Sequence, residues 1–341
     1  MEEKTLYQKL AARVGAPGSK RIADIFAMIA DENEARLLEA TPGTKEELSE
    51  RTGQPLAAVR SLLQELFHKG LIFISEKPQG AIYRMARSLV QFRDATVLWP
   101  EAPESYLQAW REFSETEYPQ MVRAKEQSGA RPGMRVIAVD RAIESGAGIL
   151  PYDAARDMIK SADALAVVNC ACRVAMANCD LPLETCLQLN KAAEYALKRG
   201  TGRPLTPEEA LKILEEAEEL GLVHSTDNRA GRGNIICNCC ADCCLSLTML
   251  IKYGGRGMDP SRFQARVDPE LCQGCQTCLD RCLFGAIFME DDTARLREDK
   301  CLGCGLCAFT CPEGAITLRE IRPAEFIPAP QAPQKTPPAA G

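Results

Sequence analysis

Histidine, long apolar runs and nucleotide-binding motifs are scarce or missing in this chain of 341 residues. With only two histidines, zinc sites that mix cysteine and histidine are nearly excluded. No stretch approaches the roughly 18 uncharged apolar residues that a membrane-spanning helix needs. The first residues also lack the basic and apolar regions of a secretory signal, and no glycine-rich phosphate-binding motif is found. These absences predict a cytoplasmic protein without membrane insertion.

Cysteine is missing from the first half of the chain and abundant in the second. All 17 cysteines lie between Cys170 and Cys311. Disulfides are rarely maintained in a reducing compartment, so thiols at this density predict metal ligands rather than cross-links. Because histidine is so rare, the expected sites are built from thiolates alone, as in Cys₄ zinc or iron–sulfur centres.

The charge of the chain bears on its partners. The formal net charge is −6, and thiolates that bind iron would add negative charge. A free-standing nucleic-acid binder is more often basic. The acidic balance therefore predicts a protein partner that offers a basic docking patch.

An internal repeat is the strongest functional signal in the sequence. Residues 272–282 read CQGCQTCLDRC and residues 301–311 read CLGCGLCAFTC, so both have the spacing C-x₂-C-x₂-C-x₃-C. Similar tails follow, LFGAIFM after the first copy and PEGAITL after the second. Three thiolates spaced in this way fit a tight loop around three corners of an iron–sulfur cubane, and the fourth thiolate comes from the other copy.

This repeat resembles the bacterial ferredoxins that carry two [4Fe–4S] clusters, over roughly 267–320. The resemblance implies one cluster on Cys272, Cys275, Cys278 and Cys311, and another on Cys301, Cys304, Cys307 and Cys282. The family usually has proline after the fourth cysteine, and Pro312 agrees with this while Leu283 departs from it. Clusters that only stabilise the fold, and zinc in place of iron, are the alternatives. Paired clusters favour electron transfer, because one cluster would suffice to stabilise a fold.

A second cysteine-rich region precedes the repeat and is assigned to no named family. Residues 237–244 read CNCCADCC, and residues 170–186 supply four more thiols. The nine candidate metal ligands of this region are Cys170, Cys172, Cys179, Cys186, Cys237, Cys239, Cys240, Cys243 and Cys244. Cys237, Cys240 and Cys243 repeat the spacing of the ferredoxin loops. We therefore expect at least one further [4Fe–4S] cluster, with a fourth ligand from 170–186.

The remaining central thiols have several interpretations. They fit a second additional cluster, part of a zinc site, a redox-active pair such as Cys239 and Cys244, or buried thiols without a ligand role. Helices expected at 186–198 and 206–223 would return the chain so that 237–244 lies beside 170–186. His224 follows the second helix, where a surface position is favoured over a role as proton donor to a cluster.

Residues 20–92 predict helices followed by two strands, a pattern that resembles the winged-helix domain. Thr44 and Glu47 form a capping box before one helix, and residues 54–70 predict the next. Positive and negative charges are nearly balanced here, whereas a DNA reader clusters basic and amide side chains on its recognition helix. A module that docks a partner protein is therefore favoured over DNA binding.

These observations predict an α+β multidomain protein. The expected parts are a winged-helix-like domain at 1–95, a helical connector at 96–130, a central cysteine-rich α/β domain at 131–260, a 2[4Fe–4S] ferredoxin domain at 261–322, and a disordered Pro/Ala-rich tail at 323–341.

The expected function is the relay of single electrons to or from a partner oxidoreductase in anaerobic metabolism. The partner would dock on the winged-helix or the central domain, and the chain would be an electron carrier or oxidoreductase subunit rather than a self-contained enzyme. Two alternatives are a redox-sensing winged-helix regulator of transcription, and an iron–sulfur reductase with a catalytic central cluster or thiol pair.

Overall fold

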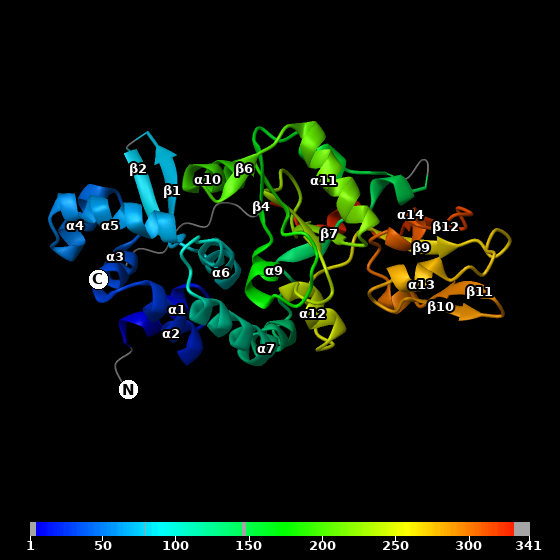
Figure 1. Ribbon diagram of the computed structural model, residues 1–341, viewed down its shortest axis with the longest axis horizontal. Helices are drawn as coiled ribbons and strands as arrows, with labels where there is room; N and C mark the ends of the chain where they lie inside the picture. Colours follow the sequence, from blue (N-terminus) through cyan, green and yellow to red (C-terminus); the bar gives the residue numbers. More distant parts are fainter. Residues whose placement is uncertain (1–4, 79, 145–147, 331–341) are drawn as a thin grey trace. The chain divides into compact units, whose positions relative to one another are not determined.

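The structure is a computed structural model that describes residues 5–78, 80–144 and 148–330 (Figure 1). By its contacts the chain divides into two compact units. The N-terminal unit is drawn from Met1–Met121, Asn169–Glu184 and Tyr195–Gly202, and the C-terminal unit from Val122–Val168, Thr185–Glu194 and Arg203–Gly341. The domain bounds expected from the sequence stay a prediction.

The N-terminal unit begins with short helices and continues into a β-hairpin. In order these are α1 (Leu6–Arg13), α2 (Lys20–Ile29), α3 (Glu32–Ala40), α4 (Lys45–Thr52), α5 (Leu56–Lys69), β1 (Ile72–Lys77) and β2 (Gly80–Met85). The expected capping box starts α4, because the Glu47 amide donates to Thr44 Oγ1 and the Thr44 amide donates to the Glu47 carboxylate. Helix α5 ends at Gly70, whose φ of 85° lies in the left-handed region. The two strands pair in antiparallel register, with Ile72 opposite Met85.

Aromatic side chains form much of the core of the N-terminal unit. Its remaining helices include α6 (Leu89–Val97), α7 (Glu104–Gln127), which continues into the other unit, and α9 (Ala171–Met176). The rings of Phe26 and Phe92 stack with their centroids 4.0 Å apart, and Trp110 meets Phe92 edge-on at 5.3 Å. Such ring pairs contribute packing energy beyond the area that they bury. None of the helices in the described ranges is long and apolar enough to cross a membrane.

A six-stranded sheet forms the centre of the C-terminal unit. Within the described ranges it has six strands in the order β3 (Met134–Val136), β7 (Val223–Asp227), β8 (Ile235–Cys239), β5 (Glu184–Leu189), β4 (Leu165–Asn169) and β6 (Gly202–Pro204). Three helices accompany it, α8 (Ala155–Lys160), α11 (Pro207–Glu219) and α12 (Leu245–Ile251). Leu214 of α11 packs in one core with Leu187 and Ile236 of the sheet.

Strand β5 replaces the first part of the helix that the sequence predicts at 186–198. Thr185, Leu187 and Leu189 are buried and alternate with partly exposed neighbours, which is the period of a strand. The helix α10 (Lys191–Arg199) begins only afterwards. Strand β5 pairs with β8 in antiparallel register, with Leu187 opposite Ile236. This pairing brings the end of the 170–186 segment beside the start of 237–244.

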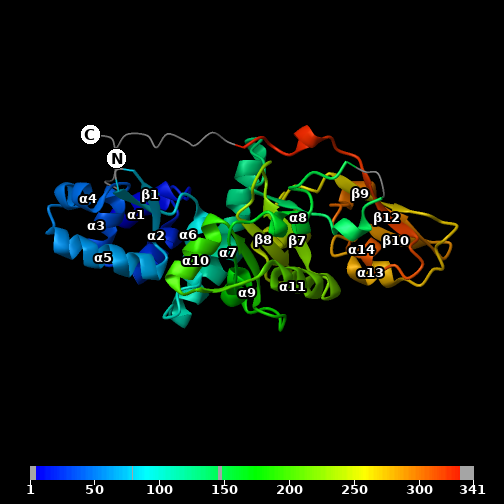
Figure 2. The same ribbon diagram turned by 90° about the horizontal axis from the view of Figure 1, so that it is seen from above.

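The cysteine repeat folds into two similar halves at the C-terminal end of the same unit (Figure 2). The elements are β9 (Phe263–Val267), α13 (Thr277–Arg281), β10 (Ile287–Glu290), β11 (Thr293–Leu296), α14 (Leu306–Phe309) and β12 (Ile316–Glu320). Strand β9 pairs with β12, and β10 pairs with β11. In each half, a short helix near the end of the cysteine run is followed by a strand: α13 by β10, and α14 by β12.

The first part of the expected disordered tail at 323–341 is packed, which corrects that prediction for 323–330. A 3₁₀ turn covers Ala324–Phe326, and the side chain of Ile327 is only 3% exposed. The carbonyl oxygen of Phe326 accepts a hydrogen bond of 2.8 Å from Arg131, whose guanidinium also lies over the Phe326 ring. These contacts hold residues 323–330 in a defined conformation, although their Pro/Ala-rich composition predicts disorder. Residues 331–341 lie outside the described part of the chain.

Candidate metal centres

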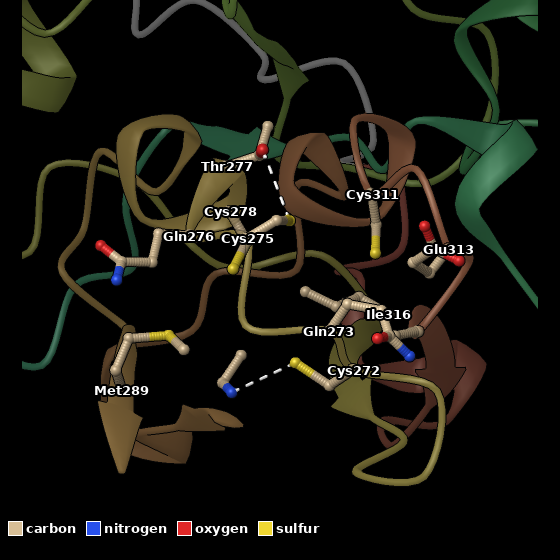
Figure 3. Close-up of a pocket in the computed structure, with 12 residues that line it drawn as sticks. Cys272, Gln273, Cys275, Gln276, Thr277, Cys278, Met289, Cys311, Glu313 and Ile316 are labelled. Atoms are coloured by element: carbon tan, nitrogen blue, oxygen red, sulfur yellow. Dashed lines mark hydrogen bonds between the residues drawn. The ribbon is translucent and has the colours of Figure 1, made fainter. Parts of the chain in front are cut away.

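In the described part of the chain, the cysteines of the repeat line two separate pockets. The first is lined by Cys272, Cys275, Cys278 and Cys311 (Figure 3). The second is lined by Cys282, Cys301, Cys304 and Cys307. These are the two sets of four that the resemblance implies. Each pocket takes three thiols from one copy of the repeat and one from the other copy.

Two glycines allow the cysteine loops to approach neighbouring backbone closely. Gly303 has a φ of 66°, and a Cβ at this position would lie 2.0 Å from the carbonyl oxygen of Phe263. Gly274 has a φ of 68°, and a Cβ there would lie 2.5 Å from the carbonyl oxygen of Asp292. Only glycine fits a left-handed position this close to another chain segment. The sequence C-x-G-C in both copies therefore follows from the packing of each loop.

Backbone amides and a hydroxyl point at the cysteine sulfurs. The amide nitrogen of Ala286 lies 3.2 Å from Cys282 Sγ, and that of Ala294 lies 3.4 Å from Cys272 Sγ. Figure 3 shows the second of these, together with the 3.5 Å contact between Cys275 Sγ and Thr277 Oγ1. Hydrogen bonds of this kind stabilise negative charge on sulfur and favour the reduced state of a bound cluster.

Burial disfavours the thiolate form of three cysteines in the second pocket. Burial raises the pKa of Cys304 to about 12, and it also raises the pKa values of Cys301 and Cys307. At Cys301 the backbone amides of Ala265 and Gly303 oppose this effect. Metals bind the thiolate, and a cationic iron–sulfur core would supply the charge that burial withholds. The donor set of each pocket, four thiols around one space, therefore fits a [4Fe–4S] cluster.

The two pockets differ in their exposure. Cys275 of the first pocket is exposed to solvent, whereas Cys301 and Cys307 of the second are buried. The loop of the second pocket is also covered by the segment after β3, because the amide of Val139 donates a hydrogen bond of 2.8 Å to the carbonyl oxygen of Cys304. The first pocket thus lies at the surface and the second lies beneath a neighbouring segment.

Strand β8 and strand β5 bring three central thiols together in the C-terminal unit. The thiol of Cys237 interacts with those of Cys186 and Cys239, and these interactions, followed by burial, raise the pKa of Cys237. The amide Nε2 of Gln188 donates a hydrogen bond of 3.1 Å to Cys186 Sγ. Ser225 Oγ lies 3.4 Å from Cys239 Sγ. The spacing in the sequence instead groups Cys237 with Cys240 and Cys243.

The cysteines that follow β8 form a different group. The Sγ atoms of Cys240 and Cys243 lie within 4.8 Å of each other, and both side chains are buried. The amide of Cys244 donates a hydrogen bond of 3.4 Å to the carbonyl oxygen of Cys240, which closes a turn before α12. Cys240 and Cys243 are thus presented by a turn rather than by a strand.

Three further candidate ligands, Cys170, Cys172 and Cys179, belong to the N-terminal unit. Cys172 lies on α9, and the guanidinium Nη1 of Arg93 on α6 is 3.4 Å from its sulfur. Arg93 is only 1% exposed and also contacts Asp94 at 3.0 Å. A buried cation beside a thiol favours the thiolate, the form that binds metal. Nothing in the sequence pattern pairs Arg93 with this cysteine.

His224 is buried, so the prediction of a surface position is wrong. It lies on β7 with 1% of its surface exposed, and its Nδ1 is 2.6 Å from Asn238 Oδ1. Its Nε2 faces the buried carboxylate of Glu218 at 3.5 Å. Burial raises the pKa of Glu218, but hydrogen bonds from His224 and Arg141 outweigh this and hold that pKa below its ordinary value. The β-branched residues Val223 and Thr226, a type that favours strands, are the signal that could have indicated β7.

The comparisons with known proteins bear on the second copy of the repeat. A family of 4Fe-4S binding domains matches residues 294–317, which include Cys301, Cys304, Cys307 and Cys311. The match implies at least one [4Fe–4S] cluster. This chain is an iron–sulfur protein. The comparisons with curated proteins and with solved structures find no match.

Proposed function

We propose that this iron–sulfur protein relays single electrons through two [4Fe–4S] clusters, one in each thiol pocket of the repeat. The observation that carries the proposal is the crossed origin of the ligands. Cys311 of the second copy joins the first pocket, and Cys282 of the first copy joins the second pocket. This arrangement holds two clusters side by side within one small fold, as electron transfer between them requires.

The residues of the chain set the conditions for this exchange. A bound [4Fe–4S] cluster gains and loses one electron between its 2+ and 1+ states. The amides of Ala286 and Ala294 donate to ligand sulfurs and so stabilise the more negative state. Cys301 and Cys307 are buried, so their sulfurs in the second pocket lie away from solvent. Exposure of Cys275 leaves the first pocket open to a partner protein.

The packing of the C-terminal unit supports a route from the first pocket inward. Cys301 and Cys307 belong to the same buried core as Val139, and that core also includes Cys239 and Cys244. Electrons that arrive at the exposed pocket would pass through the covered pocket towards the central thiols. We propose that these thiols hold at least one more cluster and that the final partner is an oxidoreductase of low-oxygen metabolism.

The N-terminal unit is proposed to dock a partner protein rather than DNA. The order of α4, α5 and the β1–β2 hairpin supports a winged-helix fold. However, basic side chains at the end of α5 already have acidic partners. Lys69 Nζ lies 2.8 Å from Glu34 Oε1, and His68 Nε2 lies 3.1 Å from Glu101. Acidic partners beside these basic side chains reduce the positive charge that is available to phosphates.

Reductive titration under anaerobic conditions tests the relay directly. The protein is titrated with dithionite while its broad visible absorption and its EPR spectrum are recorded. We expect uptake of at least about two electrons by the ferredoxin pair, with EPR signals broadened by the interaction of neighbouring clusters. A preparation that is properly folded and rich in iron but takes up no electrons would refute the proposal.

A further inference from the structure

We infer that the segment CNCCADCC serves two separate metal sites, divided at the end of strand β8. One site uses Cys186, Cys237 and Cys239, and the other uses Cys240 and Cys243. The inference deepens the proposed function and rests on its claim that the central thiols hold clusters. It replaces the grouping of Cys237 with Cys240 and Cys243 that the cysteine spacing favours.

The register of the sheet places the first set together. Residues 237 and 239 are two apart on β8, so their side chains lie on the same face of the sheet. Leu187 pairs with Ile236, and in antiparallel strands the next position along places Cys186 opposite Cys237. The thiol of Cys237 accordingly interacts with those of Cys186 and Cys239. This set is defined by strand pairing rather than by the spacing along one loop.

Polar side chains hold the first set in place. Gln188 Nε2 lies 3.1 Å from Cys186 Sγ, and Ser225 Oγ lies 3.4 Å from Cys239 Sγ. Between the two cysteines of β8, the side chain of Asn238 donates a hydrogen bond of 2.8 Å to the carbonyl oxygen of Thr185 on β5. Partners that orient metal ligands in this way are typical of metal sites. The thiols are therefore held on two strands that are locked to each other.

The second set lies beyond the strand. Cys240 and Cys243 are three residues apart in a turn, with their sulfurs within 4.8 Å. This C-x₂-C spacing in a turn matches that of the ferredoxin loops, whereas Cys237 lies back in the strand. A single loop that wraps one cluster would need all three residues in a turn. The end of β8 at Cys239 therefore separates the two sets.

The ligand class follows from the surroundings. Cys239 and Cys244 share one buried core with Cys301 and Cys307 of the second ferredoxin pocket. Thiolate sites accept zinc or iron–sulfur clusters. Because this core joins the central thiols to a pocket that is proposed to carry electrons, iron–sulfur clusters are favoured over zinc, which has no redox chemistry.

The iron and sulfide contents of single and double cysteine variants test whether the segment serves two sites. The measurements use the full-length protein, purified without oxygen. Cys186→Ala and Cys237→Ala should each lose about four irons and four sulfides relative to the unsubstituted protein. The double variant C186A/C237A should lose no more than either single variant, because both residues serve one site. The double variant C237A/C243A should lose about eight, because two sites are emptied.

A second measurement guards against variants that fail to fold. Gln188→Leu keeps every cysteine and removes only the hydrogen bond to Cys186. It should shift the EPR signal that C237A abolishes and leave unchanged the signal that C243A abolishes. Retention of the ferredoxin EPR signals in all variants is the control for folding.

Two results would overturn the inference, and they differ in what they leave standing. If C237A/C243A loses no more iron than C237A alone, the two residues share one site, and the proposed central cluster remains. If the unsubstituted protein contains only about eight irons and the central variants lose none, the central thiols hold no cluster. In that case the ferredoxin pair alone would carry the relay.

Discussion

Cys282 ends the first cysteine run of the repeat, yet it lines the same pocket as Cys304 of the second run. The exchange is reciprocal, because Cys311 of the second run lines the pocket of Cys275. Neither copy of the repeat therefore supplies a complete set of four thiols, and the two candidate clusters depend on each other for their ligands.

This crossing predicts which substitutions act on the same cluster. Cys282→Ala should weaken the cluster of Cys301, Cys304 and Cys307, although it lies in the other run. The double variant C282A/C304A should lose about the same amount of iron as C282A, whereas C282A/C275A should lose about twice as much. Iron and sulfide analysis with EPR checks this. Equal losses in the two double variants would contradict the crossed assignment.

The hydrogen bond from Gln188 to Cys186 predicts a shift in reduction potential. Without its donor, the reduced central cluster loses stabilisation, so Gln188→Leu should lower the potential of that cluster. A net hydrogen bond of about 0.5–1.5 kcal/mol corresponds to about 20–60 mV for one electron. Potentiometric EPR titration measures the shift, and Gln120→Leu on the exposed face of α7 is the control. An unchanged or raised potential would count against a ligand role for Cys186.

Buried and exposed ion pairs of the C-terminal unit should differ sharply in their contribution to stability. Arg262 Nη1 lies 2.5 Å from Asp153 Oδ2, with both side chains at 3% exposure or less. Asp153→Ala removes the buried acidic partner of Arg262, which keeps the partly exposed Glu320, and should lower the free energy of unfolding by about 1–3 kcal/mol.

The matched control is the exposed pair of Arg232 and Asp163, in which both side chains are more than half exposed. Asp163→Ala should cost about 0–1 kcal/mol. Anaerobic urea unfolding, followed by circular dichroism, compares the two variants. Equal effects would mean that the Asp153 pair does not anchor β9 as the structure indicates.

The difference in exposure between the two ferredoxin pockets predicts the order in which iron is lost. Cys275 is open to solvent, whereas Cys301 and Cys307 are buried. On exposure to air with a chelator, the cluster of the first pocket should decay first. EPR identifies each cluster by comparison with the variants C275A and C282A. Faster loss from the second pocket would contradict the proposed direction of the route.

The grouping of the repeat's cysteines around two pockets agrees with the resemblance to two-cluster ferredoxins, and three members of each group follow from local spacing. Each C-x₂-C-x₂-C run folds on itself around one space, and the tight approach at Gly303 leaves the loop little freedom. The structure gathers the same two sets of four cysteines. The capping box of Thr44 and Glu47 is likewise a local signal, and the structure contains it.

The central site depends on contacts that the sequence does not display. Cys186 meets Cys237 only because β5 pairs with β8, and the register of that pair is decided by buried residues such as Leu187 and Ile236. The same sheet buries His224, which the sequence pattern left at the end of a helix. The helix predicted at 186–198 is wrong over its first four residues, where Cys186 and Gln188 alternate with the buried Leu187 and Leu189 in the period of a strand.

The most direct test is the content of iron and acid-labile sulfide in the full-length protein, purified without oxygen. The account predicts brown protein with about sixteen irons per chain, matched by sulfide, because the ferredoxin pair accounts for about eight and the two central sites for about eight more. Colourless, iron-poor protein with zinc in its place would contradict the central claim that these thiols hold clusters for electron transfer.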